Sequence, residues 1–204
     1  MADKKAKIAV LVSGGGTNLQ AVIDAQNNGI IKSGKVELVV SNNASAYALE
    51  RAAKAGIKSV TITKKECDGN QALFEQRIIE QLDSNDIDFI VLAGFMSVLS
   101  KSFTSRYEKR IINVHPSLIP SFCGVGFYGL KVHEAALQKG VKVTGATVHF
   151  VNEIPDGGEI IFQKAVEVME NDTPEILQKR VMEQAEWIIL PAAVEKISSE
   201  LISK

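Results

Sequence analysis

The sequence predicts an α/β fold: an open, mostly parallel twisted sheet flanked by helices, with an antiparallel extension in the C-terminal half. Three observations predict it. Up to about residue 110, apolar runs typical of strands covered on both faces alternate with segments of helical periodicity. In the C-terminal half, a short loop joins two β-rich segments, which favours an antiparallel pair. The first apolar run ends in a glycine-rich loop that leads into a helix, as at a βα junction.

Length and composition fit one domain, residues 1–204, with two lobes around a cleft. The chain is 46% hydrophobic, enough for a buried core that needs no disulfides. Two cysteines, Cys67 and Cys123, set no disulfide framework, which indicates a reducing compartment and predicts a cytoplasmic location. A net charge of −1 argues against a nucleic-acid partner. With no signal peptide and no apolar run near ~20 residues, we expect no membrane association.

The N-terminal half alternates predicted strands and helices. Residues 7–12 form an almost unbroken apolar run that stops at the glycine loop. Leu19, Val22 and Ile23 then recur at helical spacing until Asn28-Gly29 supplies a stop. The other predicted strands are residues 36–40, 59–62 and 88–92, and the other predicted helices are residues 46–55, ended by Gly56, and a segment marked by Phe74, Ile78 and Leu82.

The C-terminal half has a different pattern. It contains a predicted strand at residues 110–114, a loop at 116–129, a helix at 131–139 and two β-rich segments at 141–151 and 159–168. Thr173 followed by Pro174 is a good N-cap with proline at the first helical position. A long helical region follows, and we expect a kink at Pro191.

The loop at residues 13–18 has the form of a phosphate cradle. Its glycines let the backbone approach a ligand, its free N–H groups attract an anion, and Thr17 and Asn18 add side-chain donors. A dinucleotide fingerprint would need glycine at Leu19 and an acidic residue where Ser41-Asn42-Asn43 ends strand two, and a Walker loop would need Gly-Lys-Ser/Thr. The alternative is a glycine-rich turn that only packs strand against helix.

Asn113 and His115 lie two residues apart at a strand end, so both can point to one face. An amide can donate to a developing oxyanion and an imidazole moves protons near neutral pH, a pair that suits acyl-group chemistry. The alternative is a satisfied buried polar pair. Asp156, followed by two glycines, could be a simple turn residue. A carboxylate in contact with His115 would favour imidazolium, and we expect it to outweigh desolvation in the cleft, so that the folded His115 pKa exceeds its unperturbed value of about 6.5.

Three further side chains need an assignment. His149 is in phase with the residues of a β-rich segment that can face the site, and we expect it to give a supporting hydrogen bond. His133 falls on a polar helix face, which predicts exposure to solvent. Cys123 has no positioned base and orienting group, so we expect no nucleophilic role. Since no Cys, His, Asp or Glu set has ligand spacing, we expect no metal.

Four segments taken together resemble the glycinamide ribonucleotide transformylase family, within the wider group of folate-dependent formyltransferases. They are SGGGTN at residues 13–18, VLAGFM at 91–96, NVHPSLIPSF at 113–122 and VHFVNEIPDGG at 148–158. The N-x-H-P-S-L-x-P string is far more specific than a glycine loop. The resemblance covers nearly the whole chain in order, and it implies a Rossmann-like formyltransferase fold.

The resemblance implies an enzyme of purine biosynthesis and one-carbon metabolism. Such an enzyme takes 10-formyltetrahydrofolate as a cosubstrate and transfers its formyl group directly to the amine of glycinamide ribonucleotide, through a tetrahedral intermediate. These two small molecules are then the expected partners, and a homodimer is expected as well. Its catalytic trio corresponds to Asn113, His115 and Asp156.

The resemblance also implies ligand contacts. Gly16, Thr17, Asn18 and Glu186 match the site for the substrate phosphate and ribose. The folate residues match Met96, Ser97, Val98, Leu99, Asn113, Asn152, Glu153, Ile154, Pro155 and Asp156. We therefore expect a phosphate-binding half, about residues 1–110, and a catalytic and folate-binding half, about residues 111–204.

The sequence departs from the family at three places. Ser97 stands where some members have arginine, and residues 68–71 lack a basic side chain expected near the glutamate tail of the folate. Residues 123–129 (CGVGFYG) differ in length and composition from a shorter loop in other members. The first two departures put affinity for polyglutamate in doubt.

Other functions use similar residues. A formyltetrahydrofolate hydrolase could use the trio with water in place of the amine, and a formyltransferase could act on another phosphorylated amine. Hydrolases usually have an extra N-terminal regulatory domain, which we do not expect here. Methionyl-tRNA formyltransferases add a C-terminal domain for the tRNA, for which we expect 204 residues to leave no room. A folate- or nucleotide-binding sensor would not require the trio.

Overall fold

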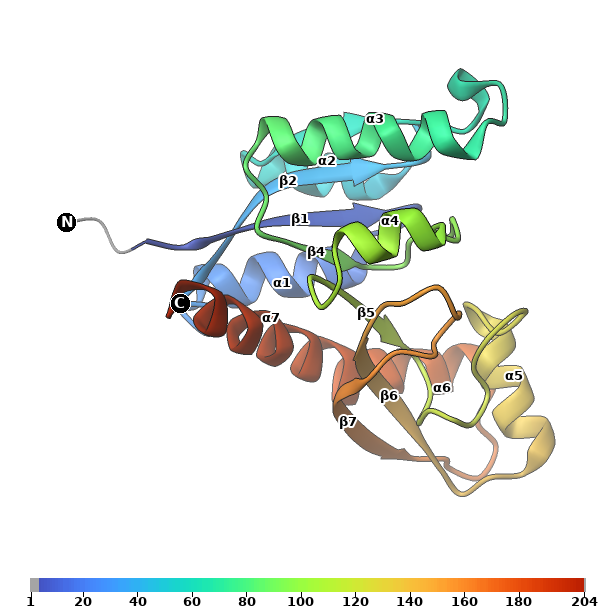
Figure 1. Cartoon of the computed structure of the whole chain (residues 1–204). Coiled ribbons are helices and arrows are strands. Elements are labelled where there is room, and N and C mark those ends of the chain that lie inside the picture. Colours follow the sequence, from blue (N-terminus) through green and yellow to red (C-terminus); the bar gives the residue numbers. More distant parts are fainter. Residues whose placement is uncertain (1–3, 204) are drawn as a thin grey trace.

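Seven strands form one sheet with the order β3-β2-β1-β4-β5-β6-β7 in a computed structural model that describes residues 4–203 (Figure 1). The strands are β1 (Ala6–Val12), β2 (Gly34–Ser41), β3 (Lys58–Thr61), β4 (Phe89–Leu92), β5 (Ile111–His115), β6 (Val143–Phe150) and β7 (Ile160–Glu167). The first five pair in parallel, whereas β6 pairs antiparallel with both β5 and β7. The predicted fold class is confirmed. Residues 1–3 and 204 of the predicted domain lie outside the described residues.

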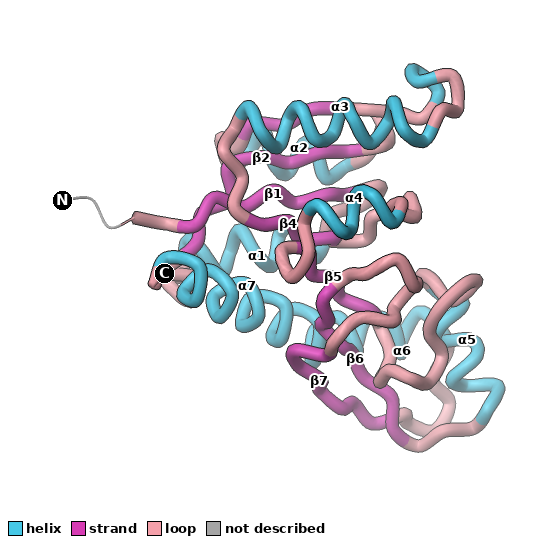
Figure 2. Tube along the Cα trace, in the orientation of Figure 1, coloured by secondary structure: helices cyan, strands magenta, loops and turns pink. Residues whose placement is uncertain are grey.

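Helices cover both faces of the sheet (Figures 1 and 2). They are α1 (Thr17–Asn27), α2 (Tyr47–Lys54), the 3₁₀ turn η1 (Lys65–Cys67), α3 (Gln71–Ser84), α4 (Lys101–Arg106), α5 (Leu130–Lys139), α6 (Pro174–Val181), the π-helical turn η2 (Met182–Glu186) and α7 (Trp187–Ile202). Helices α1, α2, α6 and α7 pack on one face, and α3 and α4 pack on the other.

The apolar run of β1 is unbroken because both of its faces are buried. Ile8 and Val10 pack with the helices of the first face, and Ala9 and Leu11 pack with α3 and α4 on the second. Each Å² of apolar surface that is buried contributes about 25 cal/mol to the stability of the fold, and this free energy drives the arrangement. The polar loops at the carboxyl ends of the parallel strands then share one edge of the sheet, where ligands bind in such folds.

Two features of the helices differ from the prediction. Helix α4 was not predicted, and it begins where the Ser100 side chain accepts a hydrogen bond from the Phe103 N–H. We expected the irregularity of the last helical region at Pro191, but the structure has it at η2, and α7 continues through Pro191. Pro191 is the fifth residue of α7 and has no N–H. The missing helical hydrogen bond is the one to the carbonyl of Trp187, the residue directly after the π-helical turn.

Candidate active site

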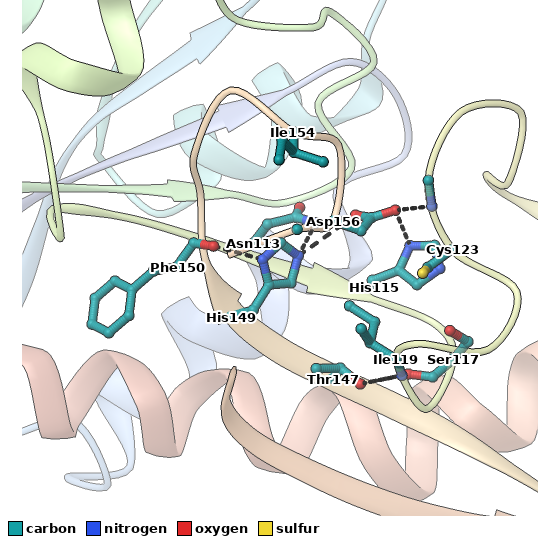
Figure 3. Close-up of polar contacts among 12 residues, drawn as sticks. Asn113, His115, Ser117, Ile119, Cys123, Thr147, His149, Phe150, Ile154 and Asp156 are labelled. Carbon is teal, nitrogen blue, oxygen red and sulfur yellow. Dashed lines mark hydrogen bonds and ion pairs between the residues drawn. The ribbon is translucent and has the colours of Figure 1, made fainter. Parts of the chain in front are cut away.

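Asn113 and His115 end β5, and the antiparallel register places His149 of β6 directly opposite Asn113. Asp156, in the loop after β6, lies between them (Figure 3). Asn113 Nδ2 is 3.2 Å from His149 Nε2 and 3.5 Å from Asp156 Oδ1, and Asp156 Oδ2 is 3.5 Å from His115 Nδ1. The structure thus brings together the three predicted catalytic residues and the predicted supporting histidine.

Backbone carbonyls fix the proton positions on both imidazoles. A carbonyl oxygen only accepts, so His115 Nε2 donates to Phe122 O at 2.8 Å and His149 Nδ1 donates to Phe150 O at 2.7 Å. In the neutral rings the remaining nitrogens are therefore acceptors. His149 Nε2 accepts from the Asn113 amide, and His115 Nδ1 presents a lone pair toward Asp156.

Burial lowers the pKa of His115 below its ordinary value. The side chain is 4% exposed, and this desolvation outweighs the hydrogen bond to Phe122 and the charge of Asp156, both of which raise the pKa. The expectation that the folded His115 pKa would lie above its unperturbed value is therefore wrong, although Asp156 raises that pKa as expected. The direct contact exists, but at 3.5 Å it does not offset the loss of water around the imidazolium.

Asp156 is held in an uncommon backbone conformation, with φ +57°. Glycines are required after it, because a Cβ at Gly157 would lie 2.7 Å from Ile154 Cβ and one at Gly158 would overlap the carbonyl of Phe150. Burial raises the Asp156 pKa, but the contact with His149 Nε2 at 3.5 Å, the bond from the Gly124 N–H and the attraction of either histidine when protonated outweigh it and leave the pKa lowered. The carboxylate is charged at neutral pH.

The glycine loop forms the N-terminus of α1. Gly16 has φ +71° and a Cβ there would lie 2.6 Å from Ala48 Cβ, so this position requires glycine. Among residues 4–203, apart from the adjacent residues, no heavy atom lies within 4 Å of the corresponding position at Gly14 or Gly15, which leaves that backbone open to a ligand. Arg51, which the sequence reading missed, donates from Nε to Gly15 O at 2.8 Å and adds a positive charge. These features together attract an anion.

Asn18 and Glu186 meet although they are far apart in the sequence. Asn18 Nδ2 donates to Glu186 Oε2 at 2.5 Å, and Glu186 lies at the end of η2 with 5% exposure. Thr17 Oγ1 is 3.8 Å from the sulfur of Met182, also in η2. The structure therefore places all four residues predicted to bind the substrate phosphate and ribose in one region, with Gly16 directly before Thr17.

The predicted folate segment, residues 96–99, is held by side chains from three other elements. Ser13 Oγ accepts from Met96 N at 2.8 Å, Asn42 Nδ2 donates to Ser97 Oγ at 2.8 Å, and Gln71 Nε2 donates to Val98 O at 3.1 Å. The side chains of Met96 and Val98 are exposed, whereas Leu99 is buried between α3 and α4, so Leu99 offers a ligand only its backbone. Sequence reasoning missed Ser13, Asn42 and Gln71 because only the register of the strands brings them to this segment.

The other predicted folate segment is the loop that bears Asp156. Asn152 closes it, accepting at Oδ1 from Ile154 N at 2.9 Å and donating from Nδ2 to Gly157 O at 3.3 Å. Glu153 reaches Lys101 of α4 at 3.7 Å, which connects this loop to the end of the segment at residues 96–99. Ile154 is exposed and Pro155 follows it, so an apolar surface lies beside the predicted catalytic residues.

Comparison with known proteins decides the family: the formyl transferase family model matches residues 6–194. The chain belongs to the formyl transferase family. It is 42% identical to phosphoribosylglycinamide formyltransferase of Escherichia coli (strain K12) over 92% of this chain and 84% of that protein. It is also 43% identical to the human trifunctional purine biosynthetic protein adenosine-3, over 96% of this chain but 19% of that protein. For the chloroplastic phosphoribosylglycinamide formyltransferase of Arabidopsis thaliana the identity is 38%, over 89% of this chain and 62% of that protein.

A solved structure agrees with this assignment. The glycinamide ribonucleotide transformylase 1 of Symbiobacterium toebii superimposes with a TM-score of 0.88 at 39% identity, over 96% of this chain and 89% of that one. The chain spans about a fifth of the length of the human trifunctional protein and somewhat under two thirds of the plant protein.

In this formyl transferase His133 is buried, which corrects the expectation of a solvated side chain. It lies on the covered face of α5 with Val132 and Ala136, and its two ring nitrogens have no hydrogen-bond partner among the described residues. Burial, aided by the charge of His115, lowers its pKa to about 4, so the ring is neutral at pH 7. The polar neighbours that suggested exposure belong to the opposite face of the helix.

The remaining candidate groups have no place in the chemistry of the site. Cys123 Sγ donates to Pro120 O at 3.3 Å, and burial, with the charge of Asp156 adding to it, raises the pKa of the thiol. A protonated thiol is a poor nucleophile. Cavities of about 300 Å³ along α1 and about 550 Å³ beside residues 140–142 and 168–172 do not touch the trio. Within residues 4–203, no three His, Cys, Asp or Glu side chains are grouped to hold a metal ion, and no helix is long and apolar enough to cross a membrane.

Glu186 should make the stability of this formyl transferase depend on pH. Burial raises its folded pKa from 4.5 to about 7, although the Asn18 bond opposes the shift. The contribution of Glu186 to the free energy of unfolding is therefore fully present below about pH 4.5. This contribution, on the order of 3 kcal/mol, is lost as pH rises through about 7. Urea unfolding across this range should show a flatter profile for Glu186→Gln. The exposed Glu183→Gln, in the same turn, should keep the wild-type slope, and identical slopes in all three proteins would contradict this account.

Proposed function

We propose that this formyl transferase moves the formyl group of 10-formyltetrahydrofolate to the amine of glycinamide ribonucleotide, giving formylglycinamide ribonucleotide and tetrahydrofolate in purine biosynthesis. The observation that carries the proposal is the convergence of Asn113, His115 and Asp156, with contacts of 3.5 Å to the carboxylate. Relatives named phosphoribosylglycinamide formyltransferase support the choice of reaction. The test is a formyl-transfer assay with candidate amines.

In the proposed mechanism the substrate amine attacks the formyl carbon and forms a carbon–nitrogen bond. The carbonyl electrons move to the oxygen, and the Asn113 amide donates to it in place of its 3.5 Å contact with Asp156, which is too long for a strong hydrogen bond. The intermediate then collapses and breaks the bond between the formyl carbon and the folate nitrogen. No covalent intermediate with the enzyme is needed.

The lowered pKa of His115 sets the order of proton transfer in this proposal. His115 enters the reaction neutral, with the lone pair of Nδ1 facing Asp156. Nδ1 takes the proton that the attacking amine loses, through water, and the Asp156 carboxylate stabilises the imidazolium that results. The proton then passes to the folate nitrogen as the old bond breaks. The number of protons is conserved, and the pair returns to its starting state.

The two halves of the chain both contribute to the proposed substrate sites. Glu186, from the second half, bonds to Asn18 of the glycine loop, and the folate segment at residues 96–99 lies in the first. In this proposal the phosphate and folate contacts cross the boundary at about residue 110, and the division into a phosphate-binding and a folate-binding half stays a prediction. The Ser97 hydroxyl bonds to Asn42, and it offers no positive charge to the glutamate tail of the folate. We therefore expect the affinity for the folate to depend only weakly on the length of its polyglutamate tail.

Phosphorylation of the amine substrate should raise its affinity by about 10- to 100-fold, because each hydrogen bond to a charged group contributes roughly 1.5–3 kcal/mol. Calorimetry with glycinamide ribonucleotide and its dephosphorylated analogue measures the difference. Gly16→Ala, which forces the loop away from Ala48, should weaken the phosphorylated ligand and leave the analogue unchanged. Equal affinities of the wild type for both ligands would remove the phosphate assignment.

The expected homodimer and cytoplasmic location stay predictions. Analytical ultracentrifugation of the purified chain measures the first. A formyltetrahydrofolate hydrolase, or a formyltransferase for another phosphorylated amine, is an alternative outcome of the transfer assay.

A further inference from the structure

Two residues of the loop between β5 and α5, Phe122 and Gly124, each contact one member of the His115–Asp156 pair. The Phe122 carbonyl accepts from His115 Nε2 at 2.8 Å, and the Gly124 N–H donates to Asp156 Oδ2 at 2.8 Å. The same Asp156 oxygen lies 3.5 Å from His115 Nδ1. These contacts close a ring in which the peptide segment spans the pair from the side opposite Asn113 (Figure 3).

We propose that residues 122–124 are a backbone clamp, a positioning element that sets the spacing of His115 and Asp156 for proton transfer. The proposal rests on the proposed function, because it assigns a role within that reaction. The clamp uses main-chain groups, so no side-chain motif marks it in the sequence. Phe122 ends the NVHPSLIPSF string at residues 113–122, and Cys123 and Gly124 begin the segment at residues 123–129 in which the sequence departs from the family pattern.

The backbone of the clamp has positive φ at both contacting residues, a conformation that surrounding contacts must enforce at Phe122 and that glycine adopts freely at Gly124. Phe122 has φ +49°, uncommon for a residue with a side chain, and Gly124 has φ +87°. The Phe122 ring packs edge-on against Phe127 at 6.4 Å between centroids. These contacts and the turn hold the Phe122 carbonyl toward His115.

The clamp is also fixed to the strand that bears His149. Thr147, opposite His115 in the β5–β6 register, accepts from Ile119 N at 3.1 Å and donates to Ser117 O at 2.7 Å (Figure 3). Ser117 in turn donates to Ser121 O at 2.6 Å, directly before the clamp. The loop therefore keeps its place relative to both strands of the site, which a positioning role requires.

The clamp acts on its two partners in opposite directions. The bond from Gly124 lowers the Asp156 pKa, and the bond to Phe122 raises the His115 pKa. The other titratable groups that face the pair are His149 from β6 and Cys123 within the clamp, and His133 of α5 interacts with His115. A loosened clamp should therefore raise the Asp156 pKa and lower the His115 pKa, since both bonds are lost together.

Gly124→Ala tests the clamp, with Gly126→Ala as the matched control. Both glycines lie in the same loop, at φ +87° and +92°, and in the described part of the chain no heavy atom beyond the adjacent residues lies within 4 Å of either added Cβ. Both substitutions therefore strain the backbone alike, but only Gly124 bonds to Asp156. NMR titration should show the opposite pKa changes at His115 and Asp156 in Gly124→Ala alone. Turnover of that variant should fall about 10- to 100-fold, as for small misplacements of catalytic groups.

The wild-type protein provides a measurement that does not depend on the variant folding. The chemical shift of the Gly124 amide should change with pH at the pKa of Asp156, and Asp156→Asn should abolish that change. The chemical shift of the Gly126 amide should not respond to the titration of Asp156. Equal pKa changes in the two glycine variants, or a Gly124 amide that ignores Asp156, would overturn the clamp. Because these NMR readouts need no turnover, they remain decisive if the transfer assay rejects the proposed reaction.

Discussion

Replacing His115 with alanine is expected to lower the turnover of formyl transfer by about 10²-fold or more, the usual contribution of a positioned proton carrier. His115 Nδ1 is the imidazole nitrogen that faces the Asp156 carboxylate with a free lone pair. Without it, the proton released by the attacking amine has no positioned acceptor next to Asp156. Steady-state kinetics with both substrates at saturation measure the change, since the loss should appear in kcat more than in KM.

His133→Ala is the matched control for this substitution. His133 is as buried as His115, so its removal leaves a cavity of similar size, but its ring nitrogens contact no polar partner among residues 4–203. Thermal unfolding should therefore show comparable destabilisation in the two variants, with turnover lost in His115→Ala only. A near-normal rate for a folded His115→Ala protein would show that the proton carrier is wrongly assigned.

Asp156→Asn is expected to lower turnover by about 10²-fold as well, through loss of charge rather than of shape. The asparagine oxygen can still accept from the Gly124 N–H, so the loop keeps its contact. Since the Asp156 charge raises the His115 pKa and burial lowers it, removing the charge should lower that pKa further. NMR titration of His115 in both proteins measures this change.

The pH dependence of activity follows from the same shift. A histidine whose folded pKa is depressed favours folding in its neutral form. Its contribution to stability is present above the unfolded pKa of about 6.5 and is lost as pH falls through the folded value. Turnover should decline over the same acidic range. Glu159→Gln, which removes an exposed charge a few residues after Asp156, should change neither the His115 pKa nor the rate. An unchanged His115 pKa in Asp156→Asn would mean that the two side chains are not coupled.

Local patterns in the sequence were sufficient for the fold and for placing Asn113 and His115 on one face of a strand end. The unbroken run in β1 predicts a strand covered on both faces, and the spacing of Asn113 and His115 predicts a shared face. Both are properties of a few neighbouring residues. The proximity of Asp156 was inferred from the family resemblance, because no local pattern connects it to His115.

Properties set by tertiary packing could not be predicted in this way. The sign of the His115 pKa shift depends on how much water the fold removes from the ring, and sequence reasoning gave the wrong sign. His133 has polar neighbours in sequence, yet α5 turns it inward with Val132. Arg51 and the residues of the clamp reach the site through contacts between separate elements, and these depend on the completed sheet.

The most direct test of the account is an assay of the purified chain with 10-formyltetrahydrofolate and glycinamide ribonucleotide, in which both products are measured. The account predicts tetrahydrofolate and formylglycinamide ribonucleotide in equal amounts, with no turnover when the amine is omitted. Release of formate and tetrahydrofolate at the same rate without the amine would identify a hydrolase and contradict the proposed transfer. Failure to produce tetrahydrofolate under either condition would contradict the use of this cosubstrate.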